Sequence, residues 1–419
     1  MSYVEGWIFH EDGFFRGGIS FSNEKIIEIF KSKPGKFARP KSIKKNEKPL
    51  AKGIIIPTFV NSHTHSADRA LRAHVASYTG TLKQLVAPPL GIKHRYLANA
   101  SKDELISSIQ TSISEMLNSG TYTFLDFREG GLEGLEIFKN AIEKYFEKND
   151  TKKSNIVQFK INAYPLSRPI ENKYKKEELD LLLEHSIGLG LSSFVDWNED
   201  EIRKVASHVK QKGKVLGIHA SERIRENIDK ILDLSPTFLV HMLEATDDDL
   251  EKVAEFNIPI VICPRANAFF GKIPNVPLML KKGILLSLGT DNSMLSKPDM
   301  FREIEFTFRI CRIHHFSKNA KMDVKPMDIL KMAVQNPRIA FMNMKKGLHE
   351  EDTPDFIILR TDSIINKGED CAGALMHASK DDIILAVNRS CDRAYRTHTN
   401  RNRRLGIFQK SSSRRLGNR

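Results

Sequence analysis

Four apolar segments of this chain run directly into residues that can bind a divalent metal. Residues 53–62 form an apolar, β-branched run that is followed by His63 and His65. Side chains two positions apart on a strand point to the same side, so these two imidazoles would face one point. A charged or imidazole group after a buried run is costly unless it is paired or ligating, so four such endings indicate one metal-binding catalytic site. The three later endings lie at His219, His241 and Asp291.

The elements that would position these residues alternate between strands and helices. Helices are indicated at 199–212 and at 247–256, and Ser101 to Glu104 has the spacing of a capping box at the start of another helix. Eight strands with intervening helices predict an α/β fold, a (β/α)8 TIM-type barrel. An open doubly wound sheet is the alternative, but no G-x-G-x-x-G or Walker pattern occurs in the sequence. The expected strands are 53–62, 121–127, 156–164, 187–193, 215–219, 237–241, 258–263 and 283–290.

A barrel gives a geometric reason to place the four endings in one site. The active sites of such barrels lie at the carboxyl ends of the strands. The polar endings fall on the expected strands one, five, six and eight, and closure of the barrel brings those ends around one mouth. We therefore expect the four imidazoles and Asp291 to converge.

Both ends of the chain contain shorter strand-like segments. Short apolar runs recur before residue 52 and again after residue 345. We expect residues 1–52 plus 346–388 to form a small β-sandwich domain, built from both ends of the chain. Residues 53–345 would form the barrel, and residues 389–419 a basic, disordered tail.

The distribution of charge argues against nucleic acid as the main partner. The formal net charge is +13 at pH 7. Residues 389–419 contain ten Lys or Arg and one acid, so the other 388 residues carry only about +4. We expect no more than weak contact with RNA or anionic surfaces, made by the tail. A nucleic-acid-binding protein that acts through this tail is the alternative from another functional class.

The cysteines and the apolar runs bear on the compartment. The four cysteines lie far apart and form no C-x-x-C pair. No apolar run approaches the length of a membrane span, and the N-terminus lacks the basic and apolar regions of a signal peptide. We therefore expect a cytoplasmic protein with no membrane partner. The helical surfaces of barrels often pair, which would give a homo-oligomer.

The order of the motifs resembles the amidohydrolase superfamily over roughly residues 1–390. The set comprises H-T-H at 63–65, H-A-S-E at 219–222, the histidine that ends the sixth strand, and G-T-D-N at 289–292. The segment from Cys263 to Asn267 is similar to the C-P-R-x-N segment of the deaminase and chlorohydrolase-like branch, which is related to cytosine and guanine deaminases.

This resemblance implies one divalent metal ion, with zinc favoured and iron as the alternative. The metal would acidify a bound water, and Asp291 would accept a proton from that water. Glu222 would move the proton to a ring nitrogen and then to departing ammonia, while His241 would hydrogen-bond the reacting centre. The expected fourth strand contains no lysine that could bridge a second metal. The implied metal ligands are His63, His65, His219 and Asp291.

Four further residues are candidates for binding the substrate. Arg128 follows the expected second strand, and His94 lies in the loop after the first. Arg265 and Asn267 belong to the C-P-R-x-N segment. The alternative for Arg128 is a surface ion pair with Glu129. The alternative for Arg265 and Asn267 is that they cap a loop.

The resemblance thus implies a hydrolase that acts on carbon–nitrogen bonds other than peptide bonds. The expected reaction removes an amino group from a small heterocyclic substrate, such as a nucleobase, and releases ammonia. Cleavage of a cyclic amide or of a chloro-heterocycle on the same site is the closest alternative. A catalytically silent barrel kept as a scaffold is less consistent with an intact set of ligands.

Overall fold

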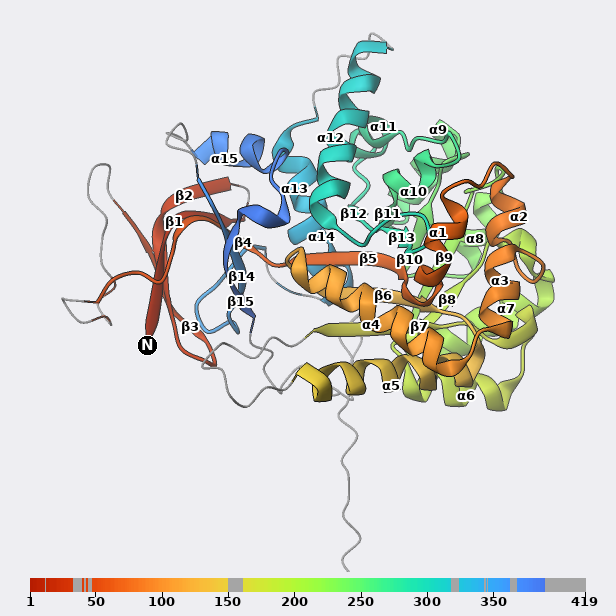
Figure 1. The fold of residues 1–419 in the computed structure, drawn as a ribbon. Helices are drawn as coiled ribbons and strands as arrows, with labels where there is room; N and C mark the ends of the chain where they lie inside the picture. The colour runs from red at the N-terminus through yellow and green to blue at the C-terminus, as the bar shows by residue number, and fades with distance from the viewer. Residues whose placement is uncertain are drawn as a thin grey trace, which may run out of the picture.

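The computed structural model describes most of residues 1–388. The described residues exclude 12, 33–39, 41–42, 44–46, 150–160, 318–323, 343, 345 and 362–367. The expected basic tail at 389–419 and the first part of the expected strand 156–164 therefore lie outside the described residues. Figure 1 shows a strand-rich part, formed by both ends of the chain, beside a larger part in which helices surround strands.

The larger part of the fold (Figure 1) is a parallel sheet of nine strands that curls into a barrel. The last two strands, β12 and β13, are joined by Gly289 and Thr290, whose backbone N–H groups donate to Ile262 O and His63 O. The chain thus passes from one edge of the sheet to the other and closes it, so the predicted TIM-type barrel is confirmed. In sheet order the strands are β12 (Leu286–Leu288), β11 (Ile260–Ile262), β10 (Phe238–His241), β9 (Val215–Ala220), β8 (Gly188–Leu191), β7 (Asn162–Ser167), β6 (Thr121–Arg128), β5 (Phe59–His65) and β13 (Asp291–Asn292).

Helices cover the outside of the barrel (Figure 1), and several of them begin at a residue whose side chain caps the helix. The side chains of Ser101, Asn198 and Thr246 accept backbone hydrogen bonds at the starts of α4, α7 and α9. The helices predicted at 199–212 and 247–256 are confirmed. In the described part of the chain, no helix is both long enough and apolar enough to span a membrane. The helices are η1 (Ser66–Leu71), α1 (Arg72–Val75), α2 (Leu82–Val86), α3 (Ile92–Asn99), α4 (Lys102–Asn118), α5 (Gly131–Asn149), η2 (Ile170–Asn172), α6 (Lys176–His185), η3 (Phe194–Asp196), α7 (Glu199–Gln211), α8 (Ile228–Asp233), α9 (Asp247–Glu255), α10 (Pro264–Ala268), α11 (Val276–Lys281), α12 (Met300–Ser317), α13 (Pro326–Val334), α14 (Asn336–Met342), α15 (Gly368–Leu375) and η4 (Lys380–Asp382).

The smaller part is one mixed sheet whose six strands come from both ends of the chain. The expected small β-domain built from both ends is therefore confirmed, and its strands belong to a single sheet. Ile8, Ile55 and Phe356 lie in its buried apolar cluster. The domain limits expected from the sequence stay predictions. In sheet order the strands are β15 (Ile383–Asn388), β14 (Asp355–Leu359), β4 (Lys52–Pro57), β1 (Ser2–His10), β2 (Gly13–Phe21) and β3 (Ile26–Lys31).

The predicted strand 53–62 is two strands, one in each part of the fold. β4 ends at Pro57, which has no backbone N–H to donate to a sheet. The next residue, Thr58, donates its hydroxyl to Asp355 (2.7 Å) and accepts hydrogen bonds from Arg338 at its carbonyl (2.8 Å) and hydroxyl (3.0 Å) oxygens. Both halves of the run are almost entirely buried, so its apolar pattern does not show where the chain changes sheet.

A phenylalanine inside the barrel supports the first histidine. The ring centroid of Phe127, on β6, lies 4.3 Å from that of His63. Gly190 and Gly217 leave room for the Phe127 ring, because a Cβ at these positions would come within 2.4 and 2.9 Å of its atoms. The packing below the mouth therefore fixes the position of a candidate ligand.

Candidate active site

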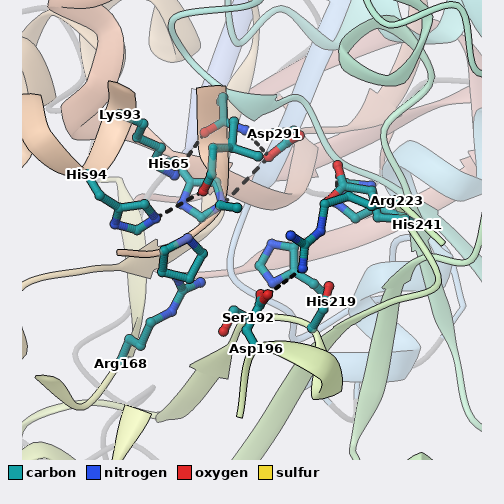
Figure 2. Close-up of a pocket in the computed structure, with 16 residues that line it drawn as sticks. His65, Lys93, His94, Arg168, Ser192, Asp196, His219, Arg223, His241 and Asp291 are labelled. Carbon is teal, nitrogen blue, oxygen red and sulfur yellow. Dashed lines mark hydrogen bonds and ion pairs between the residues drawn. The ribbon is translucent and has the colours of Figure 1, made fainter. Parts of the chain in front are cut away.

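The polar strand ends meet at the mouth of the barrel. His63 is fully buried, and its ring centroid lies 5.0 Å from that of His65 and 4.9 Å from that of His219. The convergence expected from the barrel is therefore present. The other polar ends face one pocket (Figure 2), which is lined by His65, His219, Glu222, His241 and Asp291.

The first two imidazoles flank the carboxylate of Asp291. His63 Nε2 lies 3.2 Å and His65 Nε2 lies 3.6 Å from Asp291 Oδ1. The second nitrogen of His65, Nδ1, lies 2.8 Å from Glu129 Oε1. A carboxylate behind an imidazole orients the ring and leaves the opposite nitrogen for a metal. Burial lowers the pKa of His65 to about 3, so this ring is neutral and can ligate at neutral pH.

Hydrogen bonds set which nitrogen of the two later imidazoles faces the pocket. His219 Nδ1 donates to Leu191 O (2.7 Å), which leaves Nε2 as an unprotonated ligand atom. Asn267 Nδ2 lies 3.2 Å from His241 Nδ1, and because an amide NH2 only donates, the proton of a neutral His241 ring is on Nε2. That Nε2 lies 3.5 Å from Glu222 Oε1. His241 therefore presents a hydrogen-bond donor to the pocket.

The donor set fits a divalent metal ion. Within the described residues, neither ring nitrogen of His63 makes a hydrogen bond of good geometry, although the residue is fully buried. A buried imidazole whose nitrogens lack a well-oriented hydrogen bond is costly, and a metal ion would satisfy it. Burial also lowers the pKa of His63, which keeps the ring neutral. Potential ligand atoms lie within 4.8 Å of one another in three overlapping groups, which draw on His63, His65, His219, Glu222, His241 and Asp291.

Asp291 has a strained backbone and an ionised side chain. Its φ is 58°, in the left-handed region that non-glycine residues rarely adopt. Asn292 donates its side-chain amide to Asp291 Oδ1 (2.9 Å). Burial alone would raise the pKa of the Asp291 carboxyl, but the neighbouring imidazoles, His63 first, hold that pKa well below its usual range. The carboxylate is therefore negatively charged and suited to bind a cation.

Glu222 is positioned by the loop that follows β9. Glu226 ties this loop together, because its carboxylate accepts hydrogen bonds from Ser221 N (2.6 Å) and Val195 N (3.0 Å). Lys272 Nζ donates to the backbone oxygen of Glu222 (2.9 Å). Burial raises the pKa of the Glu222 carboxyl, which favours the protonated form. Its side chain is therefore suited to carry a proton beside the metal site.

Two of the predicted substrate-binding residues lie at the pocket or next to it. His94 lines the pocket, and its Nε2 lies 3.0 Å from Val86 O. Asn267 lies behind His241 and orients its ring. Substrate contact by His94 and by Asn267 stays a prediction.

The two predicted arginines are held in ion pairs away from the pocket lining. Arg128 pairs with Glu129 (3.0 Å), and Arg265 pairs with Glu303 (3.4 Å). Among the described residues, the pocket lining includes neither arginine. Their contact with substrate also stays a prediction, while their present contacts are structural.

Sequence reasoning missed four charged residues of the pocket: Lys93, Arg168, Asp196 and Arg223. Lys93 is buried, with Nζ 2.7 Å from Glu129 Oε1 and 2.9 Å from Asn292 Oδ1. These contacts join distant parts of the chain and leave no local signal. Arg168 also lines the pocket and directly follows β7. The rule that identified His219, a polar residue at the end of an apolar strand, could have found Arg168.

Comparison with known sequences gives the same assignment as the site. The sequence profile of the Amidohydrolase family matches residues 54–387. The chain is 30% identical to an uncharacterized protein of Methanocaldococcus jannaschii over 402 residues, which covers 90% of this chain and 95% of that protein. It is 24% identical over 280 residues to the 5-methylthioadenosine/S-adenosylhomocysteine deaminase of Acetivibrio thermocellus, which covers 61% of each chain.

Solved structures share the fold. The crystal structure of atrazine chlorohydrolase from Arthrobacter aurescens, complexed with zinc, matches with a TM-score of 0.72 and 14% sequence identity. The match covers 93% of this chain and 94% of that chain. The family profile spans the barrel and the strands β4, β14 and β15 of the mixed sheet, and its match includes the histidine-rich metal site. This chain therefore belongs to the amidohydrolase family and is a hydrolase of carbon–nitrogen bonds.

Proposed function

We propose that this hydrolase is an aminohydrolase that removes the amino group from a small heterocyclic ring, such as a nucleobase. The observation that carries the proposal is the position of Glu222. Its buried carboxyl, whose pKa is raised, lies 3.5 Å from His241 and within one group of potential ligands with Asp291. Water adds its oxygen to the amino-bearing carbon, the carbon–nitrogen bond breaks, and ammonia leaves.

Each residue of the site has a separate task in this reaction. When bound, a divalent cation supplies a water that is acidic enough to react at neutral pH. The carboxylate of Asp291 accepts a proton as the new carbon–oxygen bond forms. Glu222 gives its own proton to the ring nitrogen, takes up the second proton of the added water and passes that proton to the departing amine. The proton held by Asp291 then restores the Glu222 carboxyl. His241 Nε2 donates a hydrogen bond to the oxygen that becomes the product carbonyl.

We propose zinc as the metal, with iron as the alternative. A set of neutral imidazoles and one carboxylate suits either ion, and zinc is the commoner catalytic choice for such a set. The fourth barrel strand, β8, has the sequence Gly-Leu-Gly-Leu and offers no lysine as a bridge to a second ion. A single metal per chain is therefore expected. The zinc-bound structural relative has the same fold.

The chemistry of the leaving group favours deamination over the alternatives. Ammonia leaves only after the amine gains a proton, and Glu222 is placed to supply it. Chloride leaves a chloro-heterocycle without protonation, so such a reaction would use only the first of the two proton transfers assigned to Glu222. Cleavage of a cyclic amide needs a proton as well, but it opens the ring.

A substrate panel on zinc-loaded protein tests the proposal. The panel contains nucleobases, pterins, chloro-heterocycles and cyclic amides, and the readouts are ammonia, chloride and ring opening. We expect ammonia from at least one amino-heterocycle, with neither chloride nor ring opening. The matched blank is Asp291→Asn, which should release none. Chloride release or ring opening without any ammonia would reject the aminohydrolase assignment.

A further inference from the structure

Arg168 is a buried cation of the pocket that the reaction described above does not use. It is 7% exposed, follows β7 directly, and lines the same pocket as His65 and His219. Figure 2 shows its side chain entering the pocket from a different side than Asp291. The Nε atom donates to Gly190 O (3.1 Å), which fixes the direction of the guanidinium group.

The guanidinium group of Arg168 has no carboxylate partner in the described part of the chain. The ion pairs found there, in which a nitrogen and a carboxylate oxygen lie within 4.0 Å, do not include Arg168. Glu129 and Asp196 are the carboxylates whose charges act on it from a longer distance. The pocket therefore contains a fixed positive charge that has no counterion of its own among the described residues.

The nearest carboxylates are already engaged by other cations. Lys93 Nζ lies 2.7 Å from Glu129 Oε1, and Arg128 lies 3.0 Å from Glu129 Oε2. Arg223 is ion-paired with Asp196. The lining cations Lys93 and Arg223 are thus both neutralised, whereas Arg168 is not.

A buried guanidinium without a counterion is expensive, so proteins rarely keep one without a partner. Arginine stays charged in proteins, and its planar fork of donors matches the two oxygens of a carboxylate. With Nε held by Gly190, the terminal NH groups of Arg168 remain for such a bidentate contact. A ligand carboxylate would supply the missing charge.

The position of Arg168 limits where that carboxylate can be on the substrate. The pocket that holds Arg168 together with His65 and His219 has an empty volume of about 410 Å³, part of it open to solvent. Because this figure includes space open to solvent, the enclosed part of the pocket is smaller still. An anionic group bound by Arg168 would therefore be attached to the reacting ring itself or next to it, and not to a distant tail.

We propose that the substrate is an amino-heterocycle that carries a carboxylate on or beside its ring, and that Arg168 binds this carboxylate. The inference rests on the proposed aminohydrolase function and adds a substrate class to it. Arg168 is then a specificity-determining residue, because it distinguishes acidic rings from their neutral parents.

Two matched pairs of rings test this class: pterin with pterin-6-carboxylate, and cytosine with 5-carboxycytosine. Calorimetry measures the dissociation constant of each ring for zinc-loaded protein, and ammonia release is followed in parallel. We expect the carboxylated ring of at least one pair to bind about tenfold tighter or more, since hydrogen bonds to charged groups have roughly that effect. Arg168→Gln should abolish the preference, so that the carboxylated ring binds no tighter than its neutral parent.

Two further variants complete the experiment. Arg168→Lys keeps the positive charge but not the planar fork of donors, so we expect an intermediate preference for the carboxylated ring. This variant replaces Arg168→Gln in the test if the glutamine variant does not fold. Arg309→Gln removes an exposed arginine of α12 that pairs with Glu305, and it should change neither constant. Equal or weaker binding of both carboxylated rings by the wild-type chain would overturn the inference. An undiminished preference in Arg168→Gln, or in Arg168→Lys where the glutamine variant does not fold, would overturn it as well. The dissociation constants and the ammonia release are measured separately. If only the aminohydrolase proposal fails, the carboxylated ring will bind tighter than its neutral parent but no ammonia will be released.

Discussion

At the scale of single residues, the site separates binding of the metal from movement of protons. His219 donates Nδ1–H to Leu191 O, and His65 Nδ1 lies 2.8 Å from Glu129 Oε1, so Nε2 of both rings is left for a metal. His241 receives a hydrogen bond at Nδ1 and presents a donor. The tautomer of each imidazole is therefore decided by a residue behind it, and the chemistry depends on these supporting contacts.

Glu222→Gln tests the proton-carrying role at the same scale. The amide keeps the size of the side chain but cannot carry a proton, so kcat for ammonia release should fall by roughly 10²- to 10⁴-fold. Metal content, measured by mass spectrometry, should stay at the wild-type level because the residue is assigned no ligand role. The matched control is Glu251→Gln, an exposed glutamate on α9 that pairs with Lys282. Full activity of the Glu222 variant would exclude the assigned role.

At the scale of elements, the ends of strands carry the site, and this is also the level that the sequence reveals best. An apolar run followed by a polar residue predicted the ends of β5, β9, β10 and the last strand, where the candidate ligands lie. The same pattern could not show that 53–62 divides between two sheets, because both halves are buried. It could not show the contact between Lys93 and Glu129 either. Lys93 lies on α3, in the segment after β5, and this segment meets the end of β6 only in the folded chain.

Gly289→Ala tests how closely the barrel closure supports the first ligand. A Cβ at Gly289 would lie 2.7 Å from His63 Cβ and 2.9 Å from His63 N. Both distances are shorter than a Cβ atom can have to a non-bonded neighbour without a steric clash. The backbone of β5 would have to shift, so we expect a loss of about 1–3 kcal/mol in the free energy of unfolding. Zinc affinity should fall as well, and both can be measured by denaturation with and without zinc.

The control for Gly289→Ala is Gly373→Ala. Gly373 lies in α15 with nothing near the position of a Cβ, so an alanine there should stabilise the chain by up to about 1 kcal/mol. Unchanged stability and unchanged zinc affinity of the Gly289 variant would show that the closure does not position His63.

At the scale of the whole molecule, both ends of the chain come together in one sheet beside the barrel (Figure 1). A buried arginine connects the two parts. Arg338, on α14, donates to Thr58 between the two sheets and to Asp355 at the start of β14 (2.7 Å). The amino-terminal strands, the barrel and the carboxyl-terminal strands are therefore joined at one cluster of hydrogen bonds.

Arg338→Met tests this connection. The variant leaves the Asp355 carboxylate and the Thr58 oxygens without their buried partner, so the free energy of unfolding should fall by about 3 kcal/mol. Chemical denaturation followed by circular dichroism measures the change. Arg302→Met removes an exposed arginine that pairs with Asp299, and it should alter stability by less than about 0.5 kcal/mol. Equal effects of the two variants would contradict a role for Arg338 in joining the parts.

Native mass spectrometry of metal-stripped and zinc-saturated protein is the most direct test of the site as a whole. Four strand ends that gather around one point predict a single zinc ion per chain. Asp291→Ala, at the same free zinc concentration, should bind none. A wild-type chain that takes up no zinc, or an Asp291 variant that keeps its full complement, would contradict a metal site at the mouth of the barrel.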